Sequence, residues 1–185
     1  MSETDLVIGL GARFDDRVTG KLSEFAKNAD IIHVDIDPTS IQKNVKVDLP
    51  LVGDVKEVLT ELNSVIKKGE NAKWMTEIKK WKDEHPLQYK GSSSISPQYV
   101  IEQIAQVANR DAIISTEVGQ NQMWAAQFLT MGPRRWISSA GLGTMGYGLP
   151  AGMGVKIAVP NEDVICISGD ASFQMNLQEL ATLSQ

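Results

Sequence analysis

Short apolar runs alternate with amphipathic stretches along the chain, and this alternation limits the fold more than any other feature. Leu6–Leu10 reads as a buried strand, and residues 55–68 have the spacing of an amphipathic helix. Such alternation favours a parallel sheet with crossover helices, so we expect an α/β fold. The other expected strands are residues 31–36, 45–51, 112–116, 136–138 and 164–168. The other expected helices are residues 21–27, 73–84, 96–109, 122–129, 147–158 and 172–185.

Charge density divides the 185 residues into two parts. Residues 1–90 carry 14 Lys and Arg and 16 Asp and Glu, whereas residues 91–185 carry 4 and 7. The change falls at Gly91-Ser92-Ser93-Ser94, which has the composition of a flexible linker. A strand begins close to the N-terminus and the last helix has no following strand. We therefore expect two incomplete parallel-sheet, Rossmann-like units, 1–85 and 96–185, joined by a linker over residues 86–95.

Composition excludes several classes of function. The net charge of -5 argues against a nucleic-acid groove, which needs clustered Lys and Arg. No apolar run approaches the ~18 residues that a membrane span needs. The first residues do not resemble a signal peptide, so we expect a cytoplasmic protein, or a plastid or mitochondrial one in a eukaryote. The single cysteine, Cys166, lies in an apolar run and is interpreted as buried packing.

A glycine turn follows the first strand. Gly9 and Gly11 could let backbone N–H groups approach a phosphate, and Arg13 and Arg17 suit a diphosphate. Asp35 ends the second strand, where a Rossmann unit would hold a ribose hydroxyl. A tight turn followed by an ordinary strand-end carboxylate is the alternative, and spacing alone does not decide between them.

Two further features occur in the second part. Residues 141–150 hold four glycines in their first eight positions, which indicates either close backbone packing or a mobile loop. Asp170 follows a strand and starts a helix, a position that suits a Mg²⁺–diphosphate pair. The alternative is that Asp170 only caps that helix.

Four blocks carry a family resemblance. Residues 11–20 (GARFDDRVTG) resemble the flavin-contacting signature of acetolactate synthase (acetohydroxyacid synthase) catalytic large subunits, which are thiamine-diphosphate-dependent enzymes. Residues 118–127, 141–150 and 169–176 are similar to consecutive blocks of the cofactor domain of that family. Their order and spacing agree along the whole chain. The resemblance implies the end of an FAD-holding middle domain (1–85) and the start of a diphosphate-binding domain (96–185).

The resemblance also implies roles for particular residues. Met145 would be an apolar wedge that keeps thiamine diphosphate bent, and Asp170 would ligate Mg²⁺. The residues expected to line FAD are Gly11, Ala12, Arg13, Phe14, Asp15, Asp35, Ile36, Asp54 and Val55. Those expected to touch thiamine diphosphate are Gln120, Asn121, Gly143, Thr144, Met145, Ala171 and Ser172.

Two positions depart from the family pattern. The usual family signature is Gly-Asp-Gly, and here Ala171 replaces its third residue. Asn121 stands where many relatives have histidine. In the family, the glutamate that activates the aminopyrimidine of the cofactor belongs to an earlier domain. A second metal-ligand motif follows about 25 residues after the Gly-Asp-Gly signature. We therefore expect no catalytic residue in this segment, and no activity from it alone.

In the full enzyme the resemblance implies decarboxylation of pyruvate and its carboligation to a second 2-keto acid, such as 2-ketobutyrate, for branched-chain amino acid synthesis. It further implies a homodimer or homotetramer and a small regulatory subunit as partner, with no nucleic acid and no membrane. Two alternatives remain at this point. One is another FAD-containing thiamine enzyme of the glyoxylate carboligase or pyruvate oxidase type, and the other is a non-catalytic nucleotide-binding module.

Overall fold

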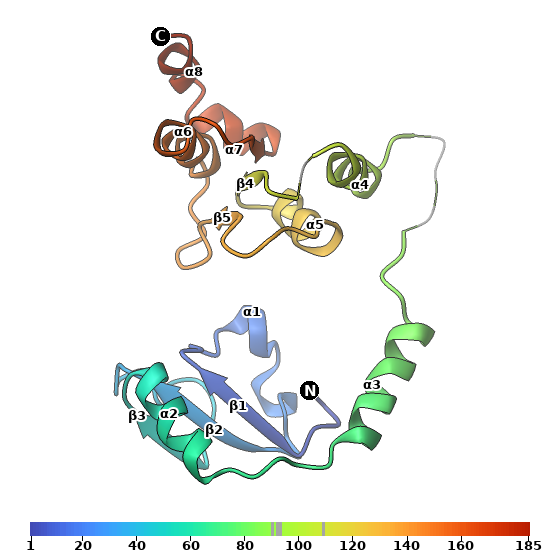
Figure 1. The fold of residues 1–185 in the computed structure, drawn as a ribbon, viewed down its shortest axis with the longest axis vertical. Helices are drawn as coiled ribbons and strands as arrows, with labels where there is room; N and C mark the ends of the chain where they lie inside the picture. Colours follow the sequence, from blue (N-terminus) through green and yellow to red (C-terminus); the bar gives the residue numbers. More distant parts are fainter. Residues whose placement is uncertain (90, 92–93, 109) are drawn as a thin grey trace. The chain divides into compact units, whose positions relative to one another are not determined.

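The computed structural model describes residues 1–89, 91, 94–108 and 110–185 (Figure 1). The chain forms two compact units, Met1–Thr76 and Glu77–Gln185, which are treated separately. Each unit contains a three-stranded parallel sheet with helices, so the predicted α/β class is confirmed. The predicted linker, residues 86–95, lies partly outside the described residues. The units divide within α3 (Ala72–Glu84), whereas the expected domain boundary is residue 85.

The first unit is built on the sheet β1-β2-β3. Its strands are β1 (Leu6–Leu10), β2 (Asp30–Asp35) and β3 (Leu49–Val52), and Gly9 lies opposite His33 in the register. The helix α2 (Val55–Val65) follows β3 and contacts β2. Between β1 and β2 the chain forms α1 (Asp16–Thr19) and a 3₁₀ helix, η1 (Leu22–Glu24). The three strands are parallel, so their carboxyl ends meet at one edge of the sheet.

The core of the first unit surrounds Phe14, whose side chain is buried although its φ of 47° is rarely adopted by such a bulky residue. Burial of the ring offsets the cost of that conformation. The residues that pack around it are Ile31, Val45 and Val47, with partly buried Val7, Ala12 and Phe25.

Two expectations for this unit were wrong in detail. Residues 21–27 do not form an α-helix, because Phe25 turns into an extended conformation to reach the core and Ala26 has a φ of 43°. The expected strand 45–51 starts only at Leu49, because Val45 and Val47 bury their side chains in a loop instead of pairing in the sheet.

The second unit is built on the sheet β5-β4-β6. Its central strand is β4 (Ile113–Thr116), flanked by β5 (Trp136–Ser138) and β6 (Val164–Ile167). The helices α4 (Pro97–Val107) and α5 (Gln120–Phe128) pack together against one face, where Ile101, Ile114, Ala125 and Ile167 form the core. The predicted start of α4 is confirmed, since Ser96 caps it and Pro97 is its first residue.

The helix α6 (Gly148–Ala158) packs closely on β4 (Figure 1). A Cβ added at Gly148 would lie 2.7 Å from the carbonyl carbon of Thr116 and from the backbone nitrogen of Glu117. A Cβ at Gly152 would lie 2.7 Å from the Oγ of Ser115. Glycine at both positions therefore lets α6 approach the strand more closely than any side chain would permit.

The expected helix 172–185 is wrong as a single element. The structure has two short helices, α7 (Asp170–Met175) and α8 (Glu179–Leu183), separated at Asn176. The side chain of Asn176 donates to the carbonyl of Gly146, a contact that a continuous helix pattern does not anticipate. Within the described residues, no helix is both long and apolar enough to cross a membrane.

Candidate functional site

Three segments meet at the carboxyl edge of the second sheet. The segments follow β4, β5 and β6, and hydrogen bonds join the first to the third. The Nδ2 of Asn121 donates to the carbonyl of Ile167 at 3.1 Å, and the Oγ of Ser172 donates to the carbonyl of Val118 at 3.3 Å. The structure therefore brings together residues expected to touch one cofactor. Gln120, the exposed first residue of α5, lies beside Asn121.

The glycine-rich loop between β5 and α6 contributes the second of these segments. Gly143 and Gly146 have φ values of 68° and 85°, which favour glycine strongly. The N–H of Thr144 donates to the Oγ of Ser139 at 3.0 Å, and Gly146 is held by Asn176. These contacts favour ordered packing over the mobile-loop alternative. Met145 lies between the two held positions, and its side chain is 40% exposed.

Asp170 is exposed and is the first residue of α7. The capping residue of α7 is Gly169, and the side chain of Asp170 makes no hydrogen bond or ion pair within the described residues, so its carboxylate remains available to a ligand. No group of three His, Cys, Asp or Glu side chains in the described part of the chain could hold a metal ion. Asp170 could thus supply one carboxylate ligand to a metal ion.

The two departures from the family pattern have clear local surroundings. Ala171 is not among the residues with positive φ, so its methyl group causes no backbone strain. Asn121 donates to the carbonyls of Ile167 and Glu117, and it thereby ties the start of α5 to the ends of β4 and β6. An asparagine at this position holds the edge of the sheet together through its amide.

Glu117 was missed by the sequence reasoning. It is fully buried at the end of β4, and its carboxylate accepts the N–H of Gly146 at 2.7 Å and the N–H of Leu149 at 3.1 Å. The only signal in the sequence is an acidic residue placed directly after a strand and two residues before Gly119. That signal is equally typical of a solvated strand end, so only the structure identifies the contact.

In the first unit, the segments expected to line FAD also follow three neighbouring parallel strands. The N–H of Gly11 donates to the carbonyl of Val34 at 2.8 Å, and the N–H of Gly53 donates to the carbonyl of Asp35 at 3.0 Å. These bonds place the loop after β1, the end of β2 and the start of α2 along one edge. Two of the expected residues, Ile36 and Val55, come directly after Asp35 and Asp54 in this arrangement.

The loop after β1 is shaped by its own charges. The Nη2 of Arg13 lies 2.6 Å from Asp15 Oδ2, and Asp15 also caps α1 through the N–H of Val18. The side chain of Arg13 remains 60% exposed, so further donors of its guanidinium stay open to a ligand. Asn44 donates to the carbonyl of Arg13 at 3.1 Å and holds the loop from the other side. A loop-shaping role for Arg13 is therefore present, and it is compatible with phosphate binding.

A buried histidine lies beneath this loop. His33 is 1% exposed, and neither ring nitrogen has a hydrogen-bond partner among the described residues. Its Nε2 lies 3.8 Å from Asp35 Oδ2, and its ring contacts Phe14. Gly9, opposite His33 in the sheet, leaves room for Phe14, because a Cβ there would lie 2.6 Å from the tip of that ring.

The two other acidic residues expected at the flavin edge make local backbone contacts. The Oδ1 of Asp35 accepts the N–H of Asp37 at 2.9 Å. Asp54 caps α2 by accepting the N–H groups of Lys56 and Glu57. One oxygen of Asp35, Oδ2, is left facing His33, so a ribose-binding role is compatible with the observed contacts.

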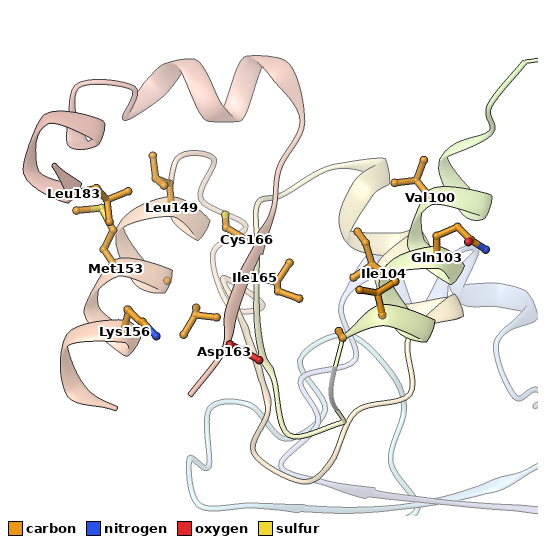
Figure 2. Close-up of a pocket in the computed structure, with 14 residues that line it drawn as sticks. Val100, Gln103, Ile104, Leu149, Met153, Lys156, Asp163, Ile165, Cys166 and Leu183 are labelled. Atoms are coloured by element: carbon orange, nitrogen blue, oxygen red, sulfur yellow. The ribbon is translucent and has the colours of Figure 1, made fainter. Parts of the chain in front are cut away.

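A separate groove of about 770 Å³ runs along the edge strand β6 (Figure 2). Val100 and Ile104 of α4 line one side, Met153 of α6 lines the other, and Cys166 lies between them. None of the expected cofactor residues lines this groove, so it is distinct from the candidate site. Burial raises the pKa of the Cys166 thiol, as expected for packing instead of reactivity.

Comparison with known proteins also divides the chain into two parts. Residues 1–62 match the model of the thiamine pyrophosphate enzyme central domain, and residues 117–185 match that of the thiamine pyrophosphate enzyme C-terminal TPP binding domain. The chain belongs to the thiamine pyrophosphate enzyme family. Within that family, it is 57% identical over 193 residues to the acetolactate synthase large subunit of Cyanidium caldarium, with all of this chain and 33% of that protein covered.

Other members of the thiamine pyrophosphate enzyme family give the same result. The chain is 55% identical to the acetolactate synthase large subunit of Porphyra purpurea, covering all of this chain and 32% of that protein. It is 49% identical to the acetolactate synthase of Mycobacterium bovis, covering 98% of this chain and 31% of that protein. The chain thus spans about a third of the length of the curated relatives it matches.

Proposed function

We propose that this chain supplies the FAD-holding and diphosphate-binding parts of an acetolactate synthase, which decarboxylates pyruvate and joins the two-carbon remainder to a second 2-keto acid. The observation that carries the proposal is the convergence of Asn121, the loop before Gly146, and Asp170 at one edge of the second sheet. Ligands of open α/β sheets bind outside the carboxyl ends of the strands. The similarity to named acetolactate synthases makes the other thiamine enzymes and the non-catalytic module less favoured.

The residues at this edge fit thiamine diphosphate with Mg²⁺. The exposed carboxylate of Asp170 offers the hard oxygen ligand that Mg²⁺ prefers, and Ala171 and Ser172 lie next to it on α7. Gln120, Asn121, Gly143, Thr144 and Met145 would hold the organic part of the cofactor. When bound, thiamine diphosphate supplies the electron sink for decarboxylation, while these residues orient it and exclude water.

The first unit would hold FAD through the edge formed by Gly11, Asp35 and Asp54. Open space beside Gly11, where a Cβ would meet nothing within 4 Å, and the exposed guanidinium of Arg13 both fit a diphosphate. The remaining expected contacts are Ala12, Phe14, Asp15, Ile36 and Val55. In this proposal FAD is structural and takes no part in the net reaction.

The partners follow from the proposed activity. We infer pyruvate and 2-ketobutyrate as substrates, a homodimer or homotetramer as the assembly, and a small regulatory subunit as a further partner. We infer a cytoplasmic location, or a plastid or mitochondrial one in a eukaryote.

The proposal is tested with Asp170→Ala in an acetolactate synthase large subunit that carries this segment. We expect loss of Mg²⁺-dependent binding of thiamine diphosphate with an unchanged circular dichroism spectrum, because the diphosphate charge would be left uncompensated. Asp163→Ala is the matched control and should bind the cofactor like the parent, because Asp163 precedes the first residue of β6 and lies at the other end of that strand. Equal affinity of the Asp170→Ala variant and the parent, measured by titration with and without Mg²⁺, would reject the assignment.

A further inference from the structure

Glu117 is a buried carboxylate without an ion-pair partner among the described residues. Its side chain is fully buried, and no Lys, Arg or His forms an ion pair with it among the described residues. A buried charge is costly unless hydrogen bonds or dipoles compensate it. At Glu117 the compensation comes from two backbone N–H groups, those of Gly146 and Leu149.

These two donors belong to the beginning of α6 and the loop before it. Tyr147, the residue that precedes the helix, provides no side-chain cap, so Glu117 satisfies an early N–H of α6 from a neighbouring strand. The positive end of the helix dipole further stabilises a carboxylate at this place. The close packing of Gly148 on the backbone of Thr116 and Glu117 brings the carboxylate within reach.

The same contacts fix the two peptide groups on either side of the Gly146 Cα, the first of which follows Met145. The N–H of Gly146 is held by Glu117, and the carbonyl of Gly146 is held by Asn176, which comes directly after α7. Gly146 has a φ of 85°, so its backbone would be free to adopt other conformations without these two side chains. The position of Met145 therefore depends on a side chain directly after β4 and a side chain directly after α7.

We propose that Glu117 is a positioning residue for thiamine diphosphate, which acts by holding Gly146 so that Met145 projects toward the cofactor. This inference rests on the proposed function, in which Met145 contacts the cofactor. Glu117 itself does not touch the cofactor in this arrangement, because its side chain is fully buried beneath the two backbone N–H groups that it accepts. Asn176 acts on the next peptide group, through the carbonyl of Gly146.

Glu117→Gln tests the inference with little change in side-chain shape. A glutamine has one acceptor oxygen, so its NH₂ group would face one of the two N–H donors and leave that donor unpaired. In an acetolactate synthase large subunit that carries this segment, we expect the dissociation constant of thiamine diphosphate to rise about tenfold, the scale of one unpaired buried donor. The dissociation constant of FAD should stay at the parent value. Glu162→Gln, which alters the partly exposed ion pair with Arg135, is the matched control.

A double-mutant cycle with Met145→Ala separates positioning from general stability. If Glu117 acts through Met145, then adding Glu117→Gln to Met145→Ala should weaken thiamine diphosphate binding by much less than about tenfold. A merely structural role would give additive losses, which would overturn the inference. Unchanged cofactor affinity in Glu117→Gln would overturn it as well.

Two further measurements keep the test decisive. If Glu117→Gln fails to fold, Asn176→Ala is measured instead, and the inference then requires the same selective loss of thiamine diphosphate affinity. If Asp170→Ala and Met145→Ala both bind the cofactor like the parent, the proposed function itself fails. If those two variants lose binding while Glu117→Gln and Asn176→Ala keep it, only the positioning role is rejected.

Discussion

The imidazole of His33 lies edge-on against the ring of Phe14, with ring centroids 4.9 Å apart and ring planes inclined by 81°. Because both nitrogens of His33 are buried without partners among the described residues, its contribution to stability is packing and not hydrogen bonding. We expect His33→Leu to keep the free energy of unfolding within about 1 kcal/mol of the parent, and His33→Ala to lower it by about 2–4 kcal/mol. Urea unfolding followed by circular dichroism measures both. Equal losses in the two variants would indicate that a polar contact, most directly with Asp35, is essential.

Gly148→Ala should destabilise the second unit. The added methyl group would meet the backbone of Thr116 and Glu117, which cannot move aside as a flexible side chain can. We expect a loss of about 1–3 kcal/mol in the free energy of unfolding, the usual scale of overpacking. Gly154→Ala, in the same helix, is the control, because a Cβ there meets nothing within 4 Å. The control should gain up to about 1 kcal/mol from helix propensity. Similar changes in both variants would contradict the close approach of α6 to β4.

Tyr89 should titrate at unusually high pH. Its hydroxyl donates to Glu102 Oε2 at 2.6 Å, and this bond, together with burial, raises the pKa of Tyr89 from 10.0 to about 12. A raised pKa in the folded state means that the bond stabilises the fold below pH 10 and that this stability is lost as the pH rises toward about 12. Ultraviolet absorbance of tyrosinate in the parent and in Tyr89→Phe isolates this titration. A midpoint for Tyr89 near 10 would show that the bond is absent in solution.

Arg13→Lys should weaken FAD binding in a large subunit that carries this segment. The planar guanidinium can bind phosphate oxygens in pairs while also contacting Asp15, and a lysine ammonium cannot reproduce that geometry. We expect a loss of about 1–3 kcal/mol for FAD. The affinity for thiamine diphosphate, measured with FAD saturating, should be nearly unchanged. Arg17→Lys is the matched control, with a smaller expected effect on FAD. The opposite pattern, with FAD unaffected and thiamine diphosphate weakened, would reverse the assignment of cofactors to the two units.

The 185-residue chain alone should have no acetolactate synthase activity. It spans about a third of the length of the relatives it matches, and the family resemblance places the glutamate that activates the aminopyrimidine in an earlier domain. With thiamine diphosphate, Mg²⁺, FAD and pyruvate added, acetolactate formation should stay at the level of a reaction without protein. Turnover comparable to that of a complete large subunit would show that the segment carries a full catalytic centre.

Strong local signals explain which elements were predicted well. The apolar run Leu6–Leu10 is a strand with the expected bounds, and α4 begins at Ser96-Pro97 because capping and the ring of proline act within one turn. The strand ends that carry the candidate sites were also expected, since parallel strands place them at one edge.

The failures came from contacts between residues distant in sequence. Residues 21–27 have a helical pattern, but Phe25 is drawn into the core around Phe14. Residues 172–185 also have a helical pattern, but the side chain of Asn176 donates to the carbonyl of Gly146, thirty positions earlier, and the helix is interrupted at Asn176. Glu117 was overlooked for the same reason, because its two donors lie 29 and 32 positions away. No local propensity encodes such contacts.

Each of the two peptide groups that flank the Cα of Gly146 is held by a side chain, the first through the N–H of Gly146 and the second through its carbonyl, so neither plane can rotate without breaking a hydrogen bond. A glycine peptide that is free to rotate would lose conformational entropy when a ligand bound, and that loss would weaken the affinity. Here the entropy is lost when the unit folds, before any ligand arrives. The loop before α6 should therefore have the same conformation with and without the cofactor, and the rate of cofactor binding should not be limited by rearrangement of this loop.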